Sequence, residues 1–215
     1  MNYLPTAPLS RRAKLSRWFA ASLLAITSML LGNLAYAEAR YQVEVIVFEH
    51  LGTKGWGEEN WRPNLSPIST QNTTADNQFN RAPLFLRPES LQMSDLARKM
   101  QTGYRVIYHQ SWSQNAPNRA NGPKVLVDHY QGNSYLSGTI GLYKTRFAHL
   151  DMNLTLARTL PNSVRADFAA RQGIPESQLP DQWRFQLKEK RKMANGELHY
   201  FDHPLFGALV RIQAR

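Results

Sequence analysis

An alternation of apolar and polar residues between positions 139 and 156 is the feature that most constrains the fold of this chain. Apolar residues occupy every second position from Ala148 to Leu156, and mainly polar residues lie between them. Ile140 and Leu142 alternate in the same way before a break at 144–146. Because successive side chains of a strand point to opposite faces, the pattern predicts antiparallel strands with one buried face and one solvated face.

Further segments predict the rest of the sheet. Tyr41–Phe48 carries valine at every second position and becomes apolar on both faces at its end, which predicts a strand buried on both sides. Tyr104–Trp112 and Lys124–His129 are rich in the β-branched and aromatic residues typical of strands. The final run, 205–212, alternates again and predicts a central strand.

One main helix is predicted between the first two strands. Met93, Leu96, Ala97 and Met100 follow helical spacing, and Gly103 comes just after them as a stop signal. Strand, helix and strand thus form an opening β-α-β unit whose helix packs on one face of the sheet. A shorter helix is expected to begin at a Ser163 cap and to end at Gly173.

A C-terminal β-hairpin is predicted from Trp183 to His203, with its turn at Asn195-Gly196. Residues 51–88 are rich in turn-forming residues and predict a long irregular loop. The fold class is therefore α+β, a single domain at 38–215 of mostly antiparallel sheet.

The first 37 residues have the three-part order of a cleavable secretory signal peptide. A cationic stretch precedes an apolar run from Trp18 to Leu31, and Ala35-Tyr36-Ala37 gives a small-residue cleavage site. The apolar run is shorter than the roughly 20 residues that span a bilayer. We expect a soluble periplasmic protein with no membrane span after signal cleavage.

Charge and cysteine content limit the partners. The whole chain carries a net charge of +10, and removal of the four cations of the signal leaves +6. In the bacterial envelope, a basic surface meets stem-peptide carboxylates and lipid headgroups, so nucleic acid is not expected as a partner. The chain has no cysteine, which excludes disulfides and a lipid anchor on cysteine.

Two histidines with an acid between them suggest a metal site at first sight. His199 and His203 are four residues apart, and Asp202 lies between them. On a strand, four residues span about 13 Å, too far for both rings to bind one ion. We therefore expect no metal or cofactor here, unless a bulge or a neighbouring histidine completes a site, and we expect these side chains to hydrogen-bond the end of the hairpin.

No catalytic motif is evident. Cysteine is absent, no Gly-x-Ser-x-Gly sequence occurs, and Glu58 and Glu59 are adjacent rather than opposed across a cleft. No glycine-rich phosphate loop follows a predicted strand. An enzyme is the less favoured interpretation, and a non-enzymatic binding module fits better.

Two groups of residues are candidates for binding. Aromatic side chains offer flat faces for sugar rings, and those considered are Trp56, Trp61, Trp112, Tyr130 and Tyr135. Trp56 and Trp61 are the candidates because they lie in the predicted loop, whereas Trp112 is expected to be structural. Alternating positions of the predicted strand 183–193 form a cationic face, which either binds carboxylates or is a solvated edge that discourages strand pairing. The cationic candidates are Arg184, Lys188, Lys190 and Lys192.

Three segments resemble the CsiV family of peptidoglycan-binding proteins. These are YQVEVIVF at 41–48, GYRVIYHQSW at 103–112 and, most distinctively, ELHYFDHPLFG at 197–207. The resemblance covers essentially the whole mature chain. Where the family pattern has Arg-Tyr-Leu-His, this chain has Arg146-Phe147-Ala148-His149. The motifs add Arg146, His149, His199, Asp202 and His203 as candidate ligand-binding residues.

The resemblance implies a non-enzymatic periplasmic protein of Gram-negative bacteria that binds peptidoglycan. It also implies that the protein helps a class A penicillin-binding protein to work with its outer-membrane lipoprotein activator, in cell-wall assembly and cell shape. A protein-only envelope adaptor without direct glycan binding is the alternative hypothesis.

Overall fold

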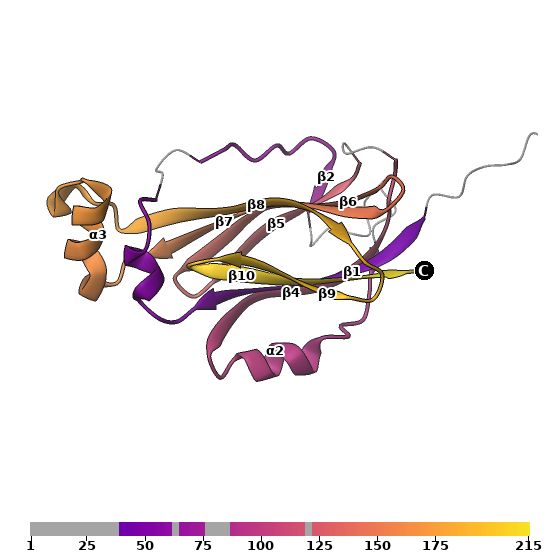
Figure 1. Ribbon diagram of the computed structural model, residues 1–215, viewed down its shortest axis with the longest axis horizontal. Coiled ribbons are helices and arrows are strands. Elements are labelled where there is room, and N and C mark those ends of the chain that lie inside the picture. The colour runs from indigo at the N-terminus through magenta and orange to yellow at the C-terminus, as the bar shows by residue number, and fades with distance from the viewer. Residues whose placement is uncertain (1–38, 62–64, 76–86, 119–121) are drawn as a thin grey trace, which may run out of the picture. The chain divides into compact units, whose positions relative to one another are not determined.

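Two β-sheets stacked face to face dominate the computed structural model (Figure 1), which describes residues 39–61, 65–75, 87–118 and 122–215. Sheet A has the strand order β3-β4-β1-β10-β9, and sheet B has the order β2-β5-β6-β7-β8. The strands of sheet A are β1 Arg40–His50, β3 Arg87–Pro88, β4 Tyr104–Asn115, β9 Leu198–His203 and β10 Phe206–Ala214. Those of sheet B are β2 Thr73–Ala75, β5 Lys124–Gln131, β6 Ser134–Lys144, β7 Ala148–Thr159 and β8 Gln182–Met193.

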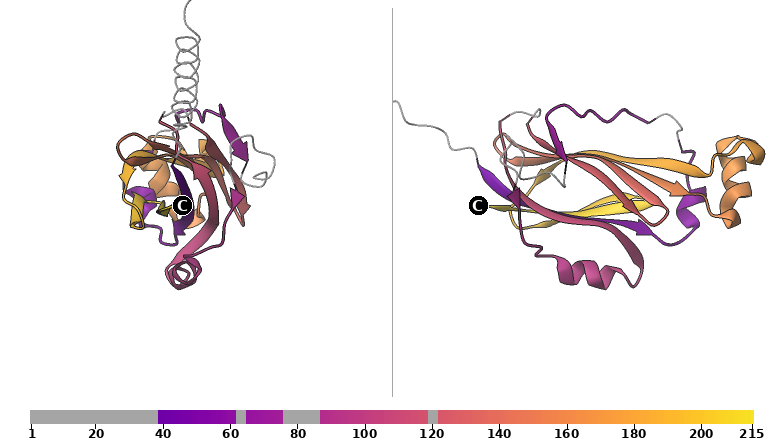
Figure 2. Two further views of the ribbon diagram at one scale, coloured as in Figure 1. Left: turned by 90° about the vertical axis from the view of Figure 1, so that its right-hand side faces the viewer. Right: turned by 180° about the vertical axis from the view of Figure 1, so that it is seen from behind.

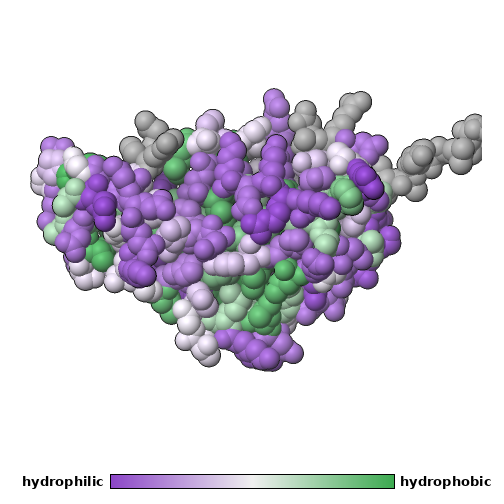
Figure 3. All heavy atoms as spheres, viewed as in Figure 1, coloured by the Kyte–Doolittle hydropathy of each residue, from purple (hydrophilic) through white to green (hydrophobic). Residues whose placement is uncertain are grey.

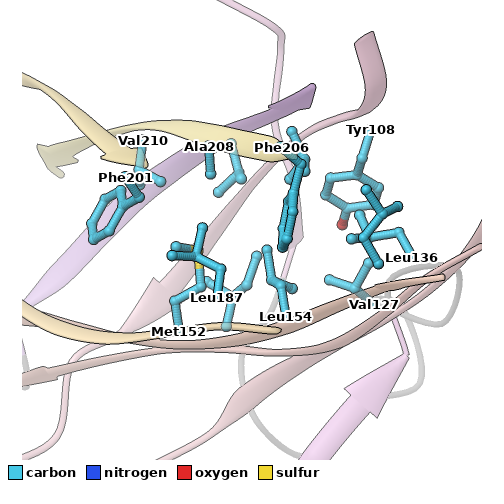
Figure 4. Packing of buried hydrophobic residues seen from close by; sticks show 14 of the residues in the cluster. Tyr108, Val127, Leu136, Met152, Leu154, Leu187, Phe201, Phe206, Ala208 and Val210 are labelled. Carbon is cyan, nitrogen blue, oxygen red and sulfur yellow. The ribbon is translucent and has the colours of Figure 1, made fainter. Parts of the chain in front are cut away.

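The hydrophobic core fills the space between the two sheets (Figure 4). Phe201, Phe206 and Val210 point from sheet A toward Met152 and Leu154 of sheet B. Each of these side chains is fully buried, and burial of one such group contributes about 1.5–3 kcal/mol. The predicted alternation of the β6–β7 meander and of β8 is confirmed, and it faces this core.

The strand predicted to be buried on both sides is β1, and β4 and β10 flank it as antiparallel neighbours. Its valines face sheet B, while Ile46 packs under the helix α2, Ser94–Met100, on the outer face of sheet A. Figure 2 (left), which looks along the strands, shows α2 lying outside the sheet. The strand, the helix and the following strand that the sequence predicts are β1, α2 and β4, and the short strands β2 and β3 come between β1 and α2. The prediction of one sheet is incomplete, because sheet B forms a second layer.

Short helices close one end of the sandwich. The 3-10 turn η3, Asn162–Val164, leads into α3, Arg165–Gln172, which buries Phe168. Gly173 ends α3 in the left-handed conformation at φ 67°, as predicted. The predicted Ser163 cap is wrong, because Ser163 lies within the 3-10 turn and no side chain caps α3. The turns η1, Lys54–Gly57, and η4, Glu176–Gln178, adjoin α3.

The hairpin predicted at Asn195-Gly196 is wrong in its pairing. β8 pairs with β7 in sheet B, whereas β9 pairs with β10 in sheet A, so the turn carries the chain from one sheet to the other. The turn is tied to β10 instead, because Gly196 N–H donates to Ile212 O at 2.8 Å and Ala214 N–H donates to Asn195 Oδ1 at 2.7 Å. The actual hairpin joins β9 and β10 around Pro204-Leu205.

Residues Glu38–Arg215 form one compact unit. The predicted signal peptide lies outside the described residues. Within the described residues, no helix is both long and apolar enough to cross a membrane. The predicted loop 51–88 is less irregular than expected, since it contains η1, β2 and β3.

Candidate functional site

The outer face of sheet B brings together most of the cationic candidates. Arg184, Lys188, Lys190 and Lys192 are exposed at alternating positions of β8, the edge strand of the sheet. The register sets Lys192 opposite His149 of β7 and Lys190 opposite Asp151. Figure 3 shows long hydrophilic side chains over this part of the molecule. The cationic face predicted from the alternation is therefore present.

Acidic side chains neutralise little of this face. Asp151 is the one acid among the outward-facing residues of β7 and β8, and both strands are fully described. Its Oδ2 lies 3.1 Å from Lys124 Nζ and 3.6 Å from Lys190 Nζ. Among the described residues, Arg184, Lys188 and Lys192 have no acidic partner. The face thus presents cations that are available to an anionic ligand.

Aromatic rings lie at both ends of the same face. Tyr143 stacks on His149 with ring centroids 5.0 Å apart, in the row that also contains Lys192. At the other end Tyr130 and Tyr135 stack at 4.2 Å, and Tyr130 is 71% exposed. An extended polymer that carries sugar rings and carboxylates could contact both the aromatic rings and the cations of this face.

A short segment crosses the middle of the outer face. Ser66 N–H donates to Gln186 Oε1 at 3.2 Å, and Gln186 Nε2 donates to Ser66 O at 3.0 Å. Gln186 Nε2 also donates to Asn153 Oδ1 of β7 at 2.8 Å. A hollow of about 430 Å³ lies between this segment and the sheet, and Tyr135 and Arg184 line it.

The loop tryptophans belong to the core and not to the surface. Trp56 is 1% exposed and Trp61 is 8% exposed. Trp56 contacts Phe168 edge-on at 5.7 Å, and both tryptophans contact Phe185 edge-on. Neither indole offers a free face to a sugar ring, because local composition predicts a loop but not what the loop covers. Trp112 is fully buried, as expected.

The β9 candidates are separated by the alternation of the strand. His199 and His203 share the side of Phe201, and Asp202 points to the opposite side, where Tyr200 Oη donates to Asp202 Oδ1 at 2.5 Å. Leu205 N–H donates to His203 Nδ1 at 3.2 Å, and Ala194 N–H donates to His199 Nε2 at 3.2 Å. Each histidine thus accepts a hydrogen bond from a backbone N–H at a turn, as expected. Within the described residues, no three His, Asp or Glu side chains are grouped as a metal site requires.

Comparison with models of known protein families identifies the family of this chain. A model for the peptidoglycan-binding protein CsiV matches residues 18–214, nearly the whole chain. The chain belongs to the CsiV family. The resemblance of its three motifs is therefore confirmed. Comparison with curated proteins and with solved structures gives no match.

The distinctive CsiV motif at 197–207 has a structural role in this chain. The His203 ring stacks on Trp61 at 4.9 Å and lies 5.0 Å from Phe206, the residue opposite it across the β9–β10 turn. Gly207 leaves no room for a Cβ, which would lie 2.7 Å from the Phe48 ring. The motif thus builds the tight hairpin that closes sheet A.

Burial of His203 makes stability depend on pH. Desolvation lowers the pKa of His203 to about 4, although the charge of Asp202 opposes the shift. Between pH 6.5 and 4 the unfolded chain binds a proton that the folded chain does not, so stability is present above this window and is lost as pH falls through it. We expect His203 to remove about 3 kcal/mol of stability between pH 7.5 and pH 4.

Urea unfolding at both pH values, compared with a His203→Gln variant, checks this expectation. Other groups titrate in both proteins, so the difference between the two pH dependences isolates His203. Equal losses in the two proteins would contradict the assignment.

The structure adds two candidate residues that the sequence of this CsiV chain did not single out. Phe147 is 41% exposed at the turn between β6 and β7, with Lys192 Nζ 3.5 Å from its ring centroid. Lys144 lies at the same turn, its Nζ 6.0 Å from the ring centroid of Tyr41. The break at 144–146 signals this turn in the sequence, but the contact with β8 depends on the register of three strands.

Proposed function

We propose that this protein binds peptidoglycan in the periplasm through the outer face of sheet B and does not cleave it. In this role it supports cell-wall assembly and cell shape, by assisting a class A penicillin-binding protein and its outer-membrane lipoprotein activator. The family description supports peptidoglycan as the ligand, and the excess of cations over acids on β7 and β8 is the observation that supports this face as the binding surface.

Stem-peptide carboxylates are the natural partners of this face. Lys188, Lys190 and Lys192 project from one side of an edge strand that is open to a large polymer. The flanking rings Tyr143 and Tyr130 allow contact with glycan in addition to charge pairing. An edge strand also uses lysines to discourage strand pairing, and this protective role is compatible with ligand binding.

The carboxylates of the face support binding without cleavage. Glycoside hydrolysis uses two opposed carboxyl groups. Asp151 is held between Lys124 and Lys190. The other outward-facing acid on the long strands of sheet B is Asp128 of β5, four residues along the strand from Lys124, which shares the row of Asp151, so the two carboxylates are not opposed. We therefore place this chain among binding proteins, and muropeptide release from purified sacculi is the measurement that would reveal a hydrolase.

A second surface supports the contact with other proteins. On the outer face of sheet A, Leu198 is 48% exposed and Tyr200 is 45% exposed, and Figure 3 shows apolar surface between α2 and the strands. Grouped apolar side chains of this kind are typical of protein interaction sites. This observation also favours the alternative function, an adaptor that touches only proteins.

Sedimentation with purified sacculi distinguishes the two functions. We expect the mature protein to sediment with sacculi at about 0.01 M salt and to be released at about 1 M, because the Debye length falls from about 30 Å to about 3 Å. Protein that stays in the supernatant at low salt would favour the protein-only adaptor. Binding that is insensitive to salt would contradict the charged site.

A further inference from the structure

A small pocket lies beside the turn between β6 and β7, where the two sheets meet at their ends. It encloses about 400 Å³, at the lower end of the range for small-ligand sites. Tyr41 and Ile212 of sheet A and Ala148 and Met193 of sheet B provide apolar walls. A ligand group that fits here is therefore small and partly apolar.

Cations line the same pocket, and aromatic rings hold them in place. Lys144, Arg146 and Lys192 all contribute to the lining. Lys192 Nζ lies 3.5 Å and Arg146 Cζ lies 5.3 Å from the ring centroid of Phe147, distances at which cation–π attraction positions the charge. Phe147 is thus a positioning residue, and its exposure at the turn is explained by the charges packed on it.

Acids do not offset these charges. Among the described residues, no acidic side chain lines the pocket, and none forms an ion pair with Lys144, Arg146 or Lys192. Asn195 also lines the pocket, and its Oδ1 is already occupied by Ala214 N–H. The pocket thus combines cations that have no acidic partner with apolar walls. A ligand that fits both features is an anion attached to a small apolar group.

We infer that this pocket binds a carboxylate whose α-carbon carries a methyl group. The carboxylate would lie among the three cations, and the methyl group would lie against Ala148 and Met193, which keep a small exposed surface. Two parts of peptidoglycan carry this group: the terminal alanine of a stem peptide, and the lactyl group of muramic acid where no stem peptide is attached to it. The inference rests on the proposed function, and it specifies which chemical group of the polymer the pocket binds.

Four soluble probes test the inference by NMR titration of residues 38–215. Acetyl-D-alanyl-D-alanine is compared with its C-terminal carboxamide, and N-acetylmuramic acid is compared with N-acetylglucosamine. We expect the amide resonances of Phe147, Ala148 and Ala194 to shift with at least one of the two acids and with neither neutral partner. The acid that binds more tightly identifies the source of the carboxylate.

Substitutions locate the binding. Lys144→Gln and Lys192→Gln should each weaken binding of the acid about tenfold, the usual effect of losing one charge-assisted contact. Phe147→Leu should weaken binding of the acid by less than tenfold. Phe147→Tyr keeps the aromatic ring and should bind the acid as tightly as the native protein does. Lys54→Gln makes the same charge change at a distant side chain that is 91% exposed, and this control should bind like the native protein.

The outcomes separate the pocket from the proposed function. Equal shifts with the carboxamide, no shift with any probe, or equal weakening by Lys54→Gln would overturn the pocket inference. If sacculi still sediment the native protein in that case, the proposed function stands. Carboxylate binding by a protein that fails to sediment with sacculi would support the pocket and overturn the proposed function.

Discussion

Replacing Arg158 with methionine is expected to lower the free energy of unfolding by about 3 kcal/mol, because the buried carboxylate of Glu49 loses one of its two cations and two backbone carbonyl oxygens lose a donor. Glu49 is fully buried at the end of β1, and its Oε2 lies 2.5 Å from Arg105 Nη2 and 3.4 Å from Arg158 Nε. Burial lowers the pKa of Arg158, and the carboxylate of Glu49 opposes that shift.

Arg158 also joins the two sheets directly. From β7 of sheet B, its Nη1 donates to His50 O at 3.2 Å and to Leu205 O at 3.4 Å, and its guanidinium lies 5.3 Å from the Trp56 ring. Urea unfolding monitored by circular dichroism measures the expected loss. A loss below about 1 kcal/mol would mean that water replaces the guanidinium and that the ion pair contributes little.

A double variant separates the buried charge from the lost packing. Glu49→Met combined with Arg158→Met removes both charges, and Arg105 can still reach solvent because its side chain is 41% exposed. Apolar replacements of a whole buried ion pair are often close to neutral. We therefore expect the double variant to be more stable than Arg158→Met alone. A double variant that is less stable would assign the loss to packing and hydrogen bonds instead.

Local patterns predicted the elements of this fold, whereas long-range pairing was beyond them. The alternation of β7 and the helical spacing from Met93 to Met100 each reflect one buried face, and such a face can be predicted from the sequence of the segment alone. Asn195-Gly196 predicts a turn but not which strands pair on either side of it. Which strand lies next to β8 depends on where Phe185 and Phe201 find apolar contacts, and these side chains face the core from opposite sheets.

The candidate site was also predictable only where it depends on a single segment. The cationic face of β8 follows from alternation along one strand, so Arg184 and the lysines were placed together correctly. Trp56 and Trp61 were not, because their burial depends on Phe168 and Phe185, which are more than a hundred residues away in the chain. Phe147 was missed for the same reason, since its partner Lys192 comes from another strand.

Replacing Lys188, Lys190 and Lys192 together with alanine is expected to weaken sacculus binding about a hundredfold at low salt. Each cation near an anionic surface contributes about 1 kcal/mol, and the three side chains project from the same face of one strand. Folding should be little affected, because all three are exposed and Asp151 keeps Lys124 as its partner. Urea unfolding and size-exclusion chromatography check that the edge strand remains folded and unpaired.

A matched triple variant separates a site from net charge. Lys54, Arg98 and Lys99 are exposed on η1 and α2, away from the outer face of sheet B, and their replacement by alanine removes the same number of cations. The two triple variants are compared at 0.1 M salt, where long-range attraction is screened within about 10 Å. If the outer face of sheet B is the site, this control should then sediment with sacculi almost as well as the native protein. Equal losses in the two triple variants would show that binding follows net charge, and an unchanged β8 variant would place the binding surface elsewhere in the molecule.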